Sequence, residues 1–279
     1  MRKSKSWIKG ESKSKSKSWN KPESSRFQTK ANKQKIFSRF KLILEYEGTR
    51  YSGWQKQQNA RTIQGELIKA CEQIFGDDFI DLQGSGRTDS GVHAISQVAH
   101  LDINTMLAPH IIQMRINDLL PYDINILYIE KTDKNFHTRH SAKSRSYLYQ
   151  ISKRRNAFEK NHIWWVKDKL DFEAMKNASK LFIGMNDFSS FSDDDPEEKS
   201  TKVVIDDIDL SEKEDLIFIR ITGSHFIWKM VRRIVGVLVE VGRGKMSDKD
   251  ILFYLNNKSG EPAKYTAPPS GLFLETVIY

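Results

Sequence analysis

The same order of predicted strands and helices occurs twice in this chain. This repeat constrains the fold more than any other feature of the sequence. In the first half, apolar residues alternate with period two or recur every three to four residues. They predict strands at 40–46, 79–82, 93–103 and 124–130 and helices at 62–75 and 109–120. Gly76 follows the first helix and Pro109 stands in the first turn of the second, as helix boundaries favour. The order β-α-β-β-α-β is that of a ferredoxin-like unit.

The second half repeats that order. Its pattern predicts strands at 145–152, 203–210, 216–222 and 272–278, helices at 172–182 and 228–241, and a short extra helix ending near 255. The expected fold class is therefore α+β, with two ferredoxin-like or RRM-like units joined side by side. Their mainly antiparallel sheets would carry helices on one face, and the cleft between the units is the expected active site. We expect these domains at 40–140 and 141–279, after a disordered tail at 1–39.

The basic character of the chain is confined to that tail. The whole sequence carries 45 lysines and arginines against 36 acids, a net charge of +9. Residues 1–39 hold 13 of the bases and 2 of the acids, so the remaining residues hold 32 and 34 and carry a net charge of −2. A folded part that is nearly neutral must bind a polyanion through a local basic cleft rather than through an overall field.

The tail is rich in lysine and serine and poor in apolar residues, a composition typical of disorder. The block Lys-Ser-Lys-Ser-Trp occurs twice, ending at Trp7 and at Trp19. Lysine attracts phosphates and tryptophan stacks on bases, so a loose tether for RNA is favoured over an inert spacer. A transit peptide is a third interpretation, because the tail is also poor in acids. Its excess of lysine over arginine and its lack of a repeating apolar face argue against that reading.

Composition excludes several kinds of protein and site. The single cysteine, Cys71, excludes an internal disulfide framework and a cysteine-rich zinc site. The sequence shows neither an apolar run of membrane-spanning length nor the apolar core of a secretory signal. It also lacks a P-loop, a dinucleotide fingerprint and a cluster of metal-ligand residues. We therefore expect a cytoplasmic protein without membrane contact, metal or cofactor.

The segment from Gly84 to Ala94 reads Gly-Ser-Gly-Arg-Thr-Asp-Ser-Gly-Val-His-Ala and places one acid between glycines, where one apolar run ends and another begins. Glycine permits a sharp turn or the close approach of a ligand. Arg87 stands two residues before Asp89 and can hold that carboxylate ionised. For a glycine-rich loop taken alone, a polar β-turn is the better interpretation.

Together with four further segments, however, this loop resembles the signature of the TruA family of tRNA pseudouridine synthases. Within the loop, Ser90 stands where alanine is common. The motif at 46–55, Tyr-Glu-Gly-Thr-Arg-Tyr-Ser-Gly-Trp-Gln, matches the family's first motif, with Glu47 replacing the usual aspartate. The other matches lie at 144–149, 186–191 and 226–236. The five matches keep the family's order and extend from about residue 40 to the C-terminus.

The resemblance implies an isomerase that converts uridine to pseudouridine in the anticodon stem-loop of tRNA, at positions 38, 39 and 40. It also implies the same two-unit architecture, usually as a homodimer. The reaction breaks and remakes a glycosidic bond without redox change or energy input, so one nucleophilic carboxylate can suffice. By resemblance that catalytic carboxylate is Asp89. The residues leave open whether it attacks the base or the sugar, or drives formation of a glycal-like intermediate.

Three further residues are expected to bind the substrate. A target uridine must leave its stack, and Tyr147 is the candidate to stack on the flipped uracil. The alternative is a half-buried sheet aromatic, the role expected for Tyr149. By resemblance, Arg232 pairs with the catalytic carboxylate, although a surface arginine is the simplest interpretation of its position. Arg87 is expected to fill the gap left by the flipped base or to hold a flanking phosphate.

Other residues are assigned by type and position. The basic residues expected near RNA are Arg50, Lys56, Arg61, Arg139, Lys143, Arg145 and Arg233. The acidic run within 193–198 is expected on a loop away from that cleft. His93 is expected to stabilise its turn by hydrogen bonding and Trp54 to brace the floor of the site. His137 and His140 lack an acid or cysteine partner that would complete a metal site.

Two other functions fit the same scaffold. A non-catalytic RNA-binding or RNA-chaperone protein would bind tRNA without converting uridine, but it has no need of an acid in a basic cleft. The chain has no RNP1-type aromatic sequence, so an ordinary RRM is not favoured. A carboxylate-based nucleosidase would release free uracil instead.

Overall fold

The computed structural model describes residues 37–194 and 200–279, and residues 36–279 form one compact unit. The tail expected at 1–39 lies outside the described residues except at its end. Ser38 and Arg39 already belong to the first strand, β1 (Ser38–Tyr46), and Arg39 pairs with Asp102 at 2.6 Å. The strand therefore begins two residues earlier than the apolar pattern predicts, because these two residues pair with the end of a neighbouring strand.

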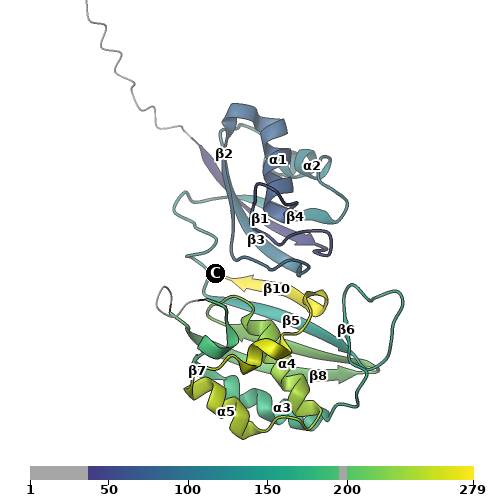
Figure 1. Cartoon of the computed structure of the whole chain (residues 1–279). Helices are drawn as coiled ribbons and strands as arrows, with labels where there is room; N and C mark the ends of the chain where they lie inside the picture. Colours follow the sequence, from purple (N-terminus) through teal and green to yellow (C-terminus); the bar gives the residue numbers. More distant parts are fainter. Residues whose placement is uncertain (1–36, 195–199) are drawn as a thin grey trace, which may run out of the picture. The chain divides into compact units, whose positions relative to one another are not determined.

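The N-terminal half has the predicted β-α-β-β-α-β order. After β1 come α1 (Ile63–Phe75), β2 (Phe79–Gly84), β3 (His93–Ile103), α2 (Pro109–Asn117) and β4 (Ile124–Thr132). The strands lie in the order β4-β1-β3-β2, and all neighbours are antiparallel. Figure 1 shows α1 and α2 together beside this part of the sheet.

The C-terminal half repeats this arrangement with additions. It contains β5 (Ser144–Ser152), α3 (Phe172–Ser179), β8 (Lys202–Lys213), β9 (Leu216–Gly223), α4 (Met230–Gly242) and β10 (Leu272–Ile278), in the sheet order β10-β5-β9-β8. Two strands were not predicted: β6 (Trp164–Trp165) pairs with the end of β5, and β7 (Gly184–Asp187) pairs with β8. The predicted extra helix is α5 (Asp248–Asn256), which Ser247 begins with a capping box.

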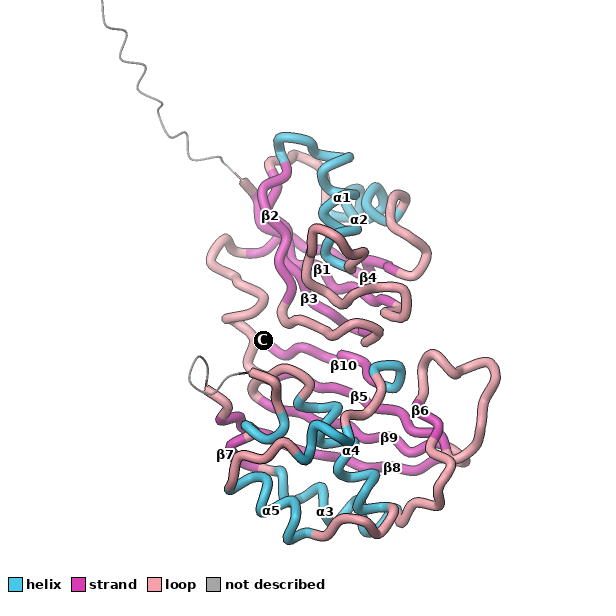
Figure 2. The backbone as a smooth tube through the Cα atoms, viewed as in Figure 1, coloured by secondary structure: helices cyan, strands magenta, loops and turns pink. Residues whose placement is uncertain are grey.

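One pair of strands joins the two halves into a ten-stranded sheet. β3 and β10 run parallel where His93 and Ala94 face Phe273 and Leu274, while β2 pairs with the other end of β3. The predicted α+β class, with a large and mostly antiparallel sheet, is confirmed (Figure 2). The division into domains at residue 140 stays a prediction.

The helix α4 is buried on all sides rather than along one apolar stripe. Arg232 is its one residue that is not buried. The segment after α5 returns to cover the helix: a Cβ on Gly236 would lie 1.6 Å from Tyr265 O, and Ala267 N donates to Arg232 O at 3.0 Å. The covering segment shows no pattern in the sequence that predicts where it packs.

The other helices are capped as their sequences favour. Thr62 accepts from Gly65 N at the start of α1, and Asp171 accepts from Ala174 N at the start of α3. α3 ends at Ser179, and a 3₁₀ turn continues to Phe182, the predicted end of that helix. None of the helices in the described part of the chain has the length and apolar character that crossing a bilayer requires.

Candidate active site

Asp89 lies in a loop of residues 85–92 whose backbone packs against the motif at 46–55. Trp54 N donates to Thr88 O at 3.1 Å. Gly53 has φ +85°, and a Cβ on it would lie 2.5 Å from Thr88 O. A glycine is required here both for the left-handed conformation and for the close approach of the two backbones. The first motif therefore fixes the loop that carries the acid.

A second close contact holds the far end of the loop. A Cβ on Gly48 would lie 1.9 Å from Val92 O, so only glycine fits. Gly48 N donates to His93 Nδ1 at 2.9 Å, and His93 is almost completely buried. This hydrogen bond is of the kind expected for His93 and ties the start of β3 to the turn after β1.

An ion pair connects the loop with the other half of the chain. Arg232 Nη1 donates to Asp89 Oδ2 at 3.0 Å, and Arg232 Nε donates to Ala267 O at 2.7 Å. The side chains of Asp89 and Arg232 keep 22% and 14% of their surface exposed. The guanidinium is thus held at two points, and its carboxylate partner remains accessible to a substrate.

Tyr147 belongs to β5, in the same half of the chain as Arg232. Its side chain is 7% exposed and packs edge-on against Phe226, with ring centroids 5.0 Å apart. Burial raises the pKa of Tyr147 to about 12, while the positive charge of Arg145 lowers it and the negative charge of Asp89 raises it further. The phenol is therefore protonated at neutral pH and lies within electrostatic reach of Asp89.

Comparison with known proteins adds a second kind of observation. A family model described as tRNA pseudouridine synthase matches residues 42–141 and 178–279. A tRNA pseudouridine synthase A from Thermosipho melanesiensis is 41% identical over 243 residues, covering 86% of this chain and 99% of that protein. Proteins of the same name from Rhodopseudomonas palustris and a Thermoanaerobacter species are 40% and 38% identical, covering 86% and 85% of this chain and 99% and 98% of their own lengths. The chain belongs to the TruA family of tRNA pseudouridine synthases.

The predicted family is thereby confirmed, and with it the class of enzyme, an isomerase. The solved structure "Crystal Structure of a Cbf5-Nop10-Gar1 Complex" contains a chain that is 11% identical, with a TM-score of 0.29, and the match covers 71% of this TruA chain and 54% of that one. A similarity of this size adds nothing to the assignment.

Two neighbours of Tyr147 on β5 of this TruA protein, one aromatic and one basic, are buried and form hydrogen bonds that stabilise the fold. Tyr149 is fully buried and donates to Pro268 O at 2.7 Å, which fits the structural role expected for it. Arg145 is also buried, and its guanidinium donates to the backbone oxygens of Ser85, Arg139 and Ser224. Arg145 therefore connects the start of the Asp89 loop with segments of the C-terminal half.

The basic residues predicted near RNA fall into two groups. Six are exposed on the surface: Arg50, Lys56, Arg61, Arg87, Arg139 and Lys143. Arg145 and Arg233 are buried. Arg233 forms an ion pair with Asp193, so neither buried arginine presents a free charge in this conformation. Contact with RNA stays a prediction for all eight residues.

The acidic run does not lie on a loop apart from the site residues. Asp193 pairs with Lys229 at 2.6 Å as well as with Arg233, and Asp194 accepts from Trp228 N at 3.0 Å. These contacts surround the first turn of α4, which carries Arg232. The expectation of a loop away from the site was wrong for Asp193 and Asp194, because Lys229 and Arg233 bind the first carboxylate and the backbone N–H of Trp228 binds the second. The rest of the run lies outside the described residues.

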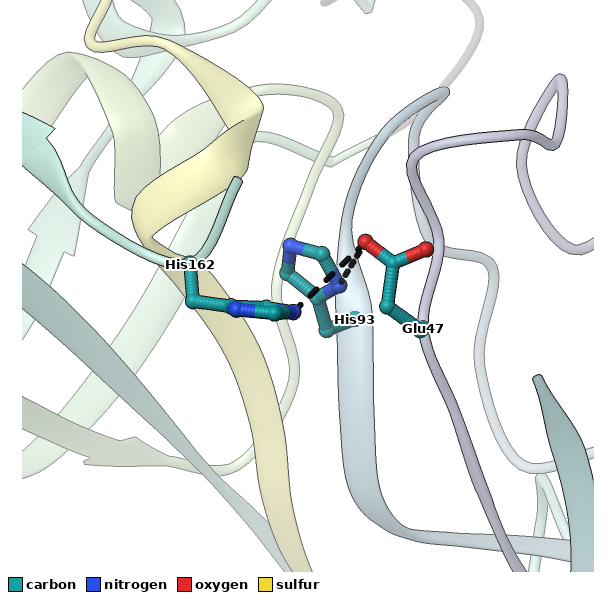
Figure 3. Close-up of side chains that lie close together, drawn as sticks. All are labelled: Glu47, His93 and His162. Atoms are coloured by element: carbon teal, nitrogen blue, oxygen red, sulfur yellow. Dashed lines mark ion pairs between the residues drawn. The ribbon is translucent and has the colours of Figure 1, made fainter. Parts of the chain in front are cut away.

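One cluster of possible metal ligands was missed in the sequence. Glu47, His93 and His162 each offer one ligand atom, and these atoms lie within 4.8 Å of one another (Figure 3). The three residues come from the end of β1, the start of β3 and the loop before β6, so spacing along the chain does not connect them. The one signal available was Glu47, which departs from the aspartate usual in the family motif.

Proposed function

We propose that this TruA enzyme converts uridine to pseudouridine at positions 38, 39 and 40 of the anticodon stem-loop of tRNA, with Asp89 as the catalytic carboxylate. Membership of the family supports pseudouridine formation in tRNA. The observation that carries the assignment of Asp89 is its 3.0 Å ion pair with Arg232, a residue from the other half of the chain. The carboxylate keeps 22% of its side-chain surface exposed, so a substrate can reach it, as a nucleophile requires.

The reaction to be explained is a rearrangement. The bond between C1′ and N1 breaks, the base turns, and a bond between C1′ and C5 forms. C5 loses a proton and N1 gains one, so the product is an isomer of the substrate. Asp89 can act at the sugar or at the base, or remove a sugar proton to give a glycal-like intermediate. In each case the hydrogen bond from Arg232 Nη1 to Asp89 Oδ2 holds the carboxylate in position.

Tyr147 is the proposed platform for the flipped base. Stacking of a base on an aromatic ring contributes about 1–3 kcal/mol, which is comparable with the few kcal/mol needed to flip the nucleotide out. Because burial raises the pKa of Tyr147 to about 12, its hydroxyl keeps its proton at neutral pH. The hydroxyl can therefore donate a hydrogen bond to the uracil or relay a proton to it.

The exposed arginines and lysines are the proposed contacts to the tRNA backbone. Arg87 stands two residues from Asp89, and Arg139 and Lys143 both lie just before β5. A flipped nucleotide leaves a gap in its helix, and the long side chain of Arg87 can fill it. We also propose, from the family resemblance, that the enzyme acts as a homodimer in the cytoplasm.

The decisive experiment is to incubate purified protein with an unmodified tRNA and to map pseudouridine at nucleotide resolution. We expect modification within positions 38 to 40 and no release of free uracil. Asp89→Asn should bind the tRNA and form no pseudouridine, whereas Asp206→Asn, which changes an exposed acid on β8, should behave as the wild type. Turnover by Asp89→Asn would show that Asp89 is not the catalytic carboxylate. Wild-type binding without turnover would favour the non-catalytic RNA-binding protein.

A further inference from the structure

Three side chains that the proposed reaction does not use meet where β1 ends and β3 begins (Figure 3). Glu47 Oε1 lies 3.7 Å from His93 Nδ1 and 3.6 Å from His162 Nε2. Zinc binds carboxylate oxygen and imidazole nitrogen at about 2.0–2.2 Å, so the ligand atoms of a tetrahedral site lie roughly 3.3–3.6 Å apart. The two separations from Glu47 are close to that range, and the two histidine nitrogens lie within 4.8 Å of each other, so a small movement of side chains would bring the three ligand atoms into a tetrahedral arrangement.

Hydrogen bonds fix the state of His93 that a metal requires. His93 Nε2 lies 2.9 Å from Asn161 O, and a carbonyl oxygen only accepts, so this nitrogen carries the proton. Nδ1 accepts from Gly48 N and is therefore unprotonated. Histidine ligands commonly donate their second N–H to a backbone carbonyl in this way, which fixes the tautomer and the orientation of the ring.

The surroundings favour a cation with one open coordination position. The three side chains line a cavity of about 310 Å³ together with Glu45, Asp123 and Asn125. Two additional carboxylates make the cavity negative, and its volume leaves room for water as a fourth ligand. The side chains of Glu47 and His162 are 29% and 44% exposed, so an ion can enter from solvent.

We propose that Glu47, His93 and His162 bind a divalent transition-metal ion, with zinc the best match to two imidazoles and one carboxylate. Asp89, Tyr147 and Arg232 do not line this cavity, so the ion has a structural role. The ion connects three segments: the loop before β6, the first residue of β3, and the turn that follows β1. His93 follows Asp89 by four residues, and the ion therefore also stabilises the end of the active-site loop.

Two existing hydrogen bonds compete with the ion and set its affinity. Gly48 N already donates to His93 Nδ1 at 2.9 Å, and Thr49 Oγ1 donates to Glu47 Oε1. The ion must displace the first and share the carboxylate with the second. We expect binding that is reversible and weaker than at a closed four-ligand zinc site. We also expect dependence on the length of Glu47, since aspartate is one methylene shorter.

The test uses the full chain without an affinity tag, treated with chelator and titrated with Co²⁺ as a spectroscopic probe for zinc. We expect one ion per chain, a visible absorption band of a site with fewer than six ligands, displacement by Zn²⁺ and a rise in Tm with Zn²⁺. His162→Asn should abolish the band, and Glu47→Asp should weaken binding by about tenfold or more. His162 is half-exposed on a loop, so its replacement leaves the core intact.

The matched control is the double variant His137→Asn/His140→Asn. The centroids of these two rings lie 4.3 Å apart on another loop, so they offer adjacent imidazoles that could also bind Co²⁺. The control should keep the band and the Zn²⁺ effect on Tm. The proposal is overturned if the wild type gives no band, if His162→Asn binds as the wild type does, or if the control variant loses the site.

Discussion

The two halves of the molecule share a strand order but hold their active-site residues in different ways. In the N-terminal half, Asp89 lies on a loop that is fixed by backbone contacts, above all the approach of Gly53 to Thr88 O. In the C-terminal half, Tyr147 and Arg232 project from a strand and a helix whose neighbouring residues are buried. The acid therefore depends on a few positions where no side chain fits, whereas its partners depend on packing that many residues share.

The largest effect is expected from removing the contact between the halves. Arg232→Ala should lower kcat by about 10²- to 10³-fold, the size typical of losing one well-placed donor from a catalytic site. Arg232→Lys keeps the charge but cannot bond both Ala267 O and Asp89, so it should restore only part of the rate. Arg115→Ala, on the exposed face of α2, is the control. The effect is measured as the single-turnover rate on tRNA. A wild-type rate in Arg232→Ala would show that catalysis does not depend on the ion pair between Asp89 and Arg232.

The dependence of Asp89 on close backbone contact is tested with two glycines of positive φ. Gly53→Ala introduces a Cβ 2.5 Å from Thr88 O at φ +85°, while Gly244→Ala introduces one with no atom within 4 Å at φ +69°. Both variants carry backbone strain of about 1–3 kcal/mol. Only Gly53→Ala should also lower kcat, by about tenfold, because it moves the loop that carries Asp89. Equal kinetic effects in the two variants would contradict the comparison.

The two tyrosines of β5 offer a comparison within the C-terminal half. Tyr147→Phe keeps the ring and should bind tRNA normally, but its kcat should fall by about tenfold or more if the hydroxyl relays a proton. Tyr149→Phe loses the hydrogen bond to Pro268 O and should lower the free energy of unfolding by about 1 kcal/mol without changing kcat. Rates and denaturant unfolding measured on both variants check the assignment. A reversed pattern would exchange the roles of the two residues.

The buried phenol of Tyr147 also predicts a dependence of stability on pH. Its pKa is raised from 10.0 to about 12 by burial, so between these values the unfolded chain loses the proton and the folded chain keeps it. The stabilisation is complete below pH 10 and is lost as pH rises through about 12. The free energy of unfolding should therefore fall over this window, and Tyr147→Phe should fall less steeply than the wild type. Identical slopes would show that the phenol is not buried in solution.

The smallest effect is expected at the start of α4. Burial alone would raise the pKa of Asp193, but hydrogen bonds from Lys229 and Arg233 outweigh it and hold the pKa below its ordinary value. Because the side chain of Asp193 keeps 33% of its surface exposed and asparagine can still accept a hydrogen bond, Asp193→Asn should cost only about 1 kcal/mol. A drop in kcat of a few-fold at unchanged KM is expected, since the helix that presents Arg232 is loosened. Asp209→Asn, which removes a surface partner of Arg220 at 3.6 Å, should leave kcat unchanged.

Periodicity predicted the order of the elements well and the shortest strands not at all. The predicted limits 93–103 and 272–278 agree with those of β3 and β10, although residues 97–103 of β3 are all buried rather than buried on one face. β6 has two residues and β7 has four, which is too short for alternation to be recognised. Their positions follow from backbone pairing with β5 and β8, a property that side-chain pattern does not encode.

The candidate site was predictable where the family's motifs carry its residues. The contact between Asp89 and Arg232 was expected from the family resemblance, and the structure contains it. The burial of Arg145 and Arg233 was not expected, because an arginine on a strand or helix has the same sequence signature whether its partners are backbone carbonyls, a carboxylate or RNA. The approach of His162 to Glu47 depends on a loop of irregular conformation, for which the sequence offers no periodic signal.

The short parallel register between β3 and β10 has a consequence for how the enzyme is made. β10 follows every other element in chain order, yet it completes the C-terminal sheet and supplies the residues that pair with His93 and Ala94. A nascent or truncated chain that stops before β10 has both its acid and its arginine but no strand to bring them to one another. We therefore expect chains truncated before β10 to form no pseudouridine, because they lack the strand that joins the two halves of the sheet.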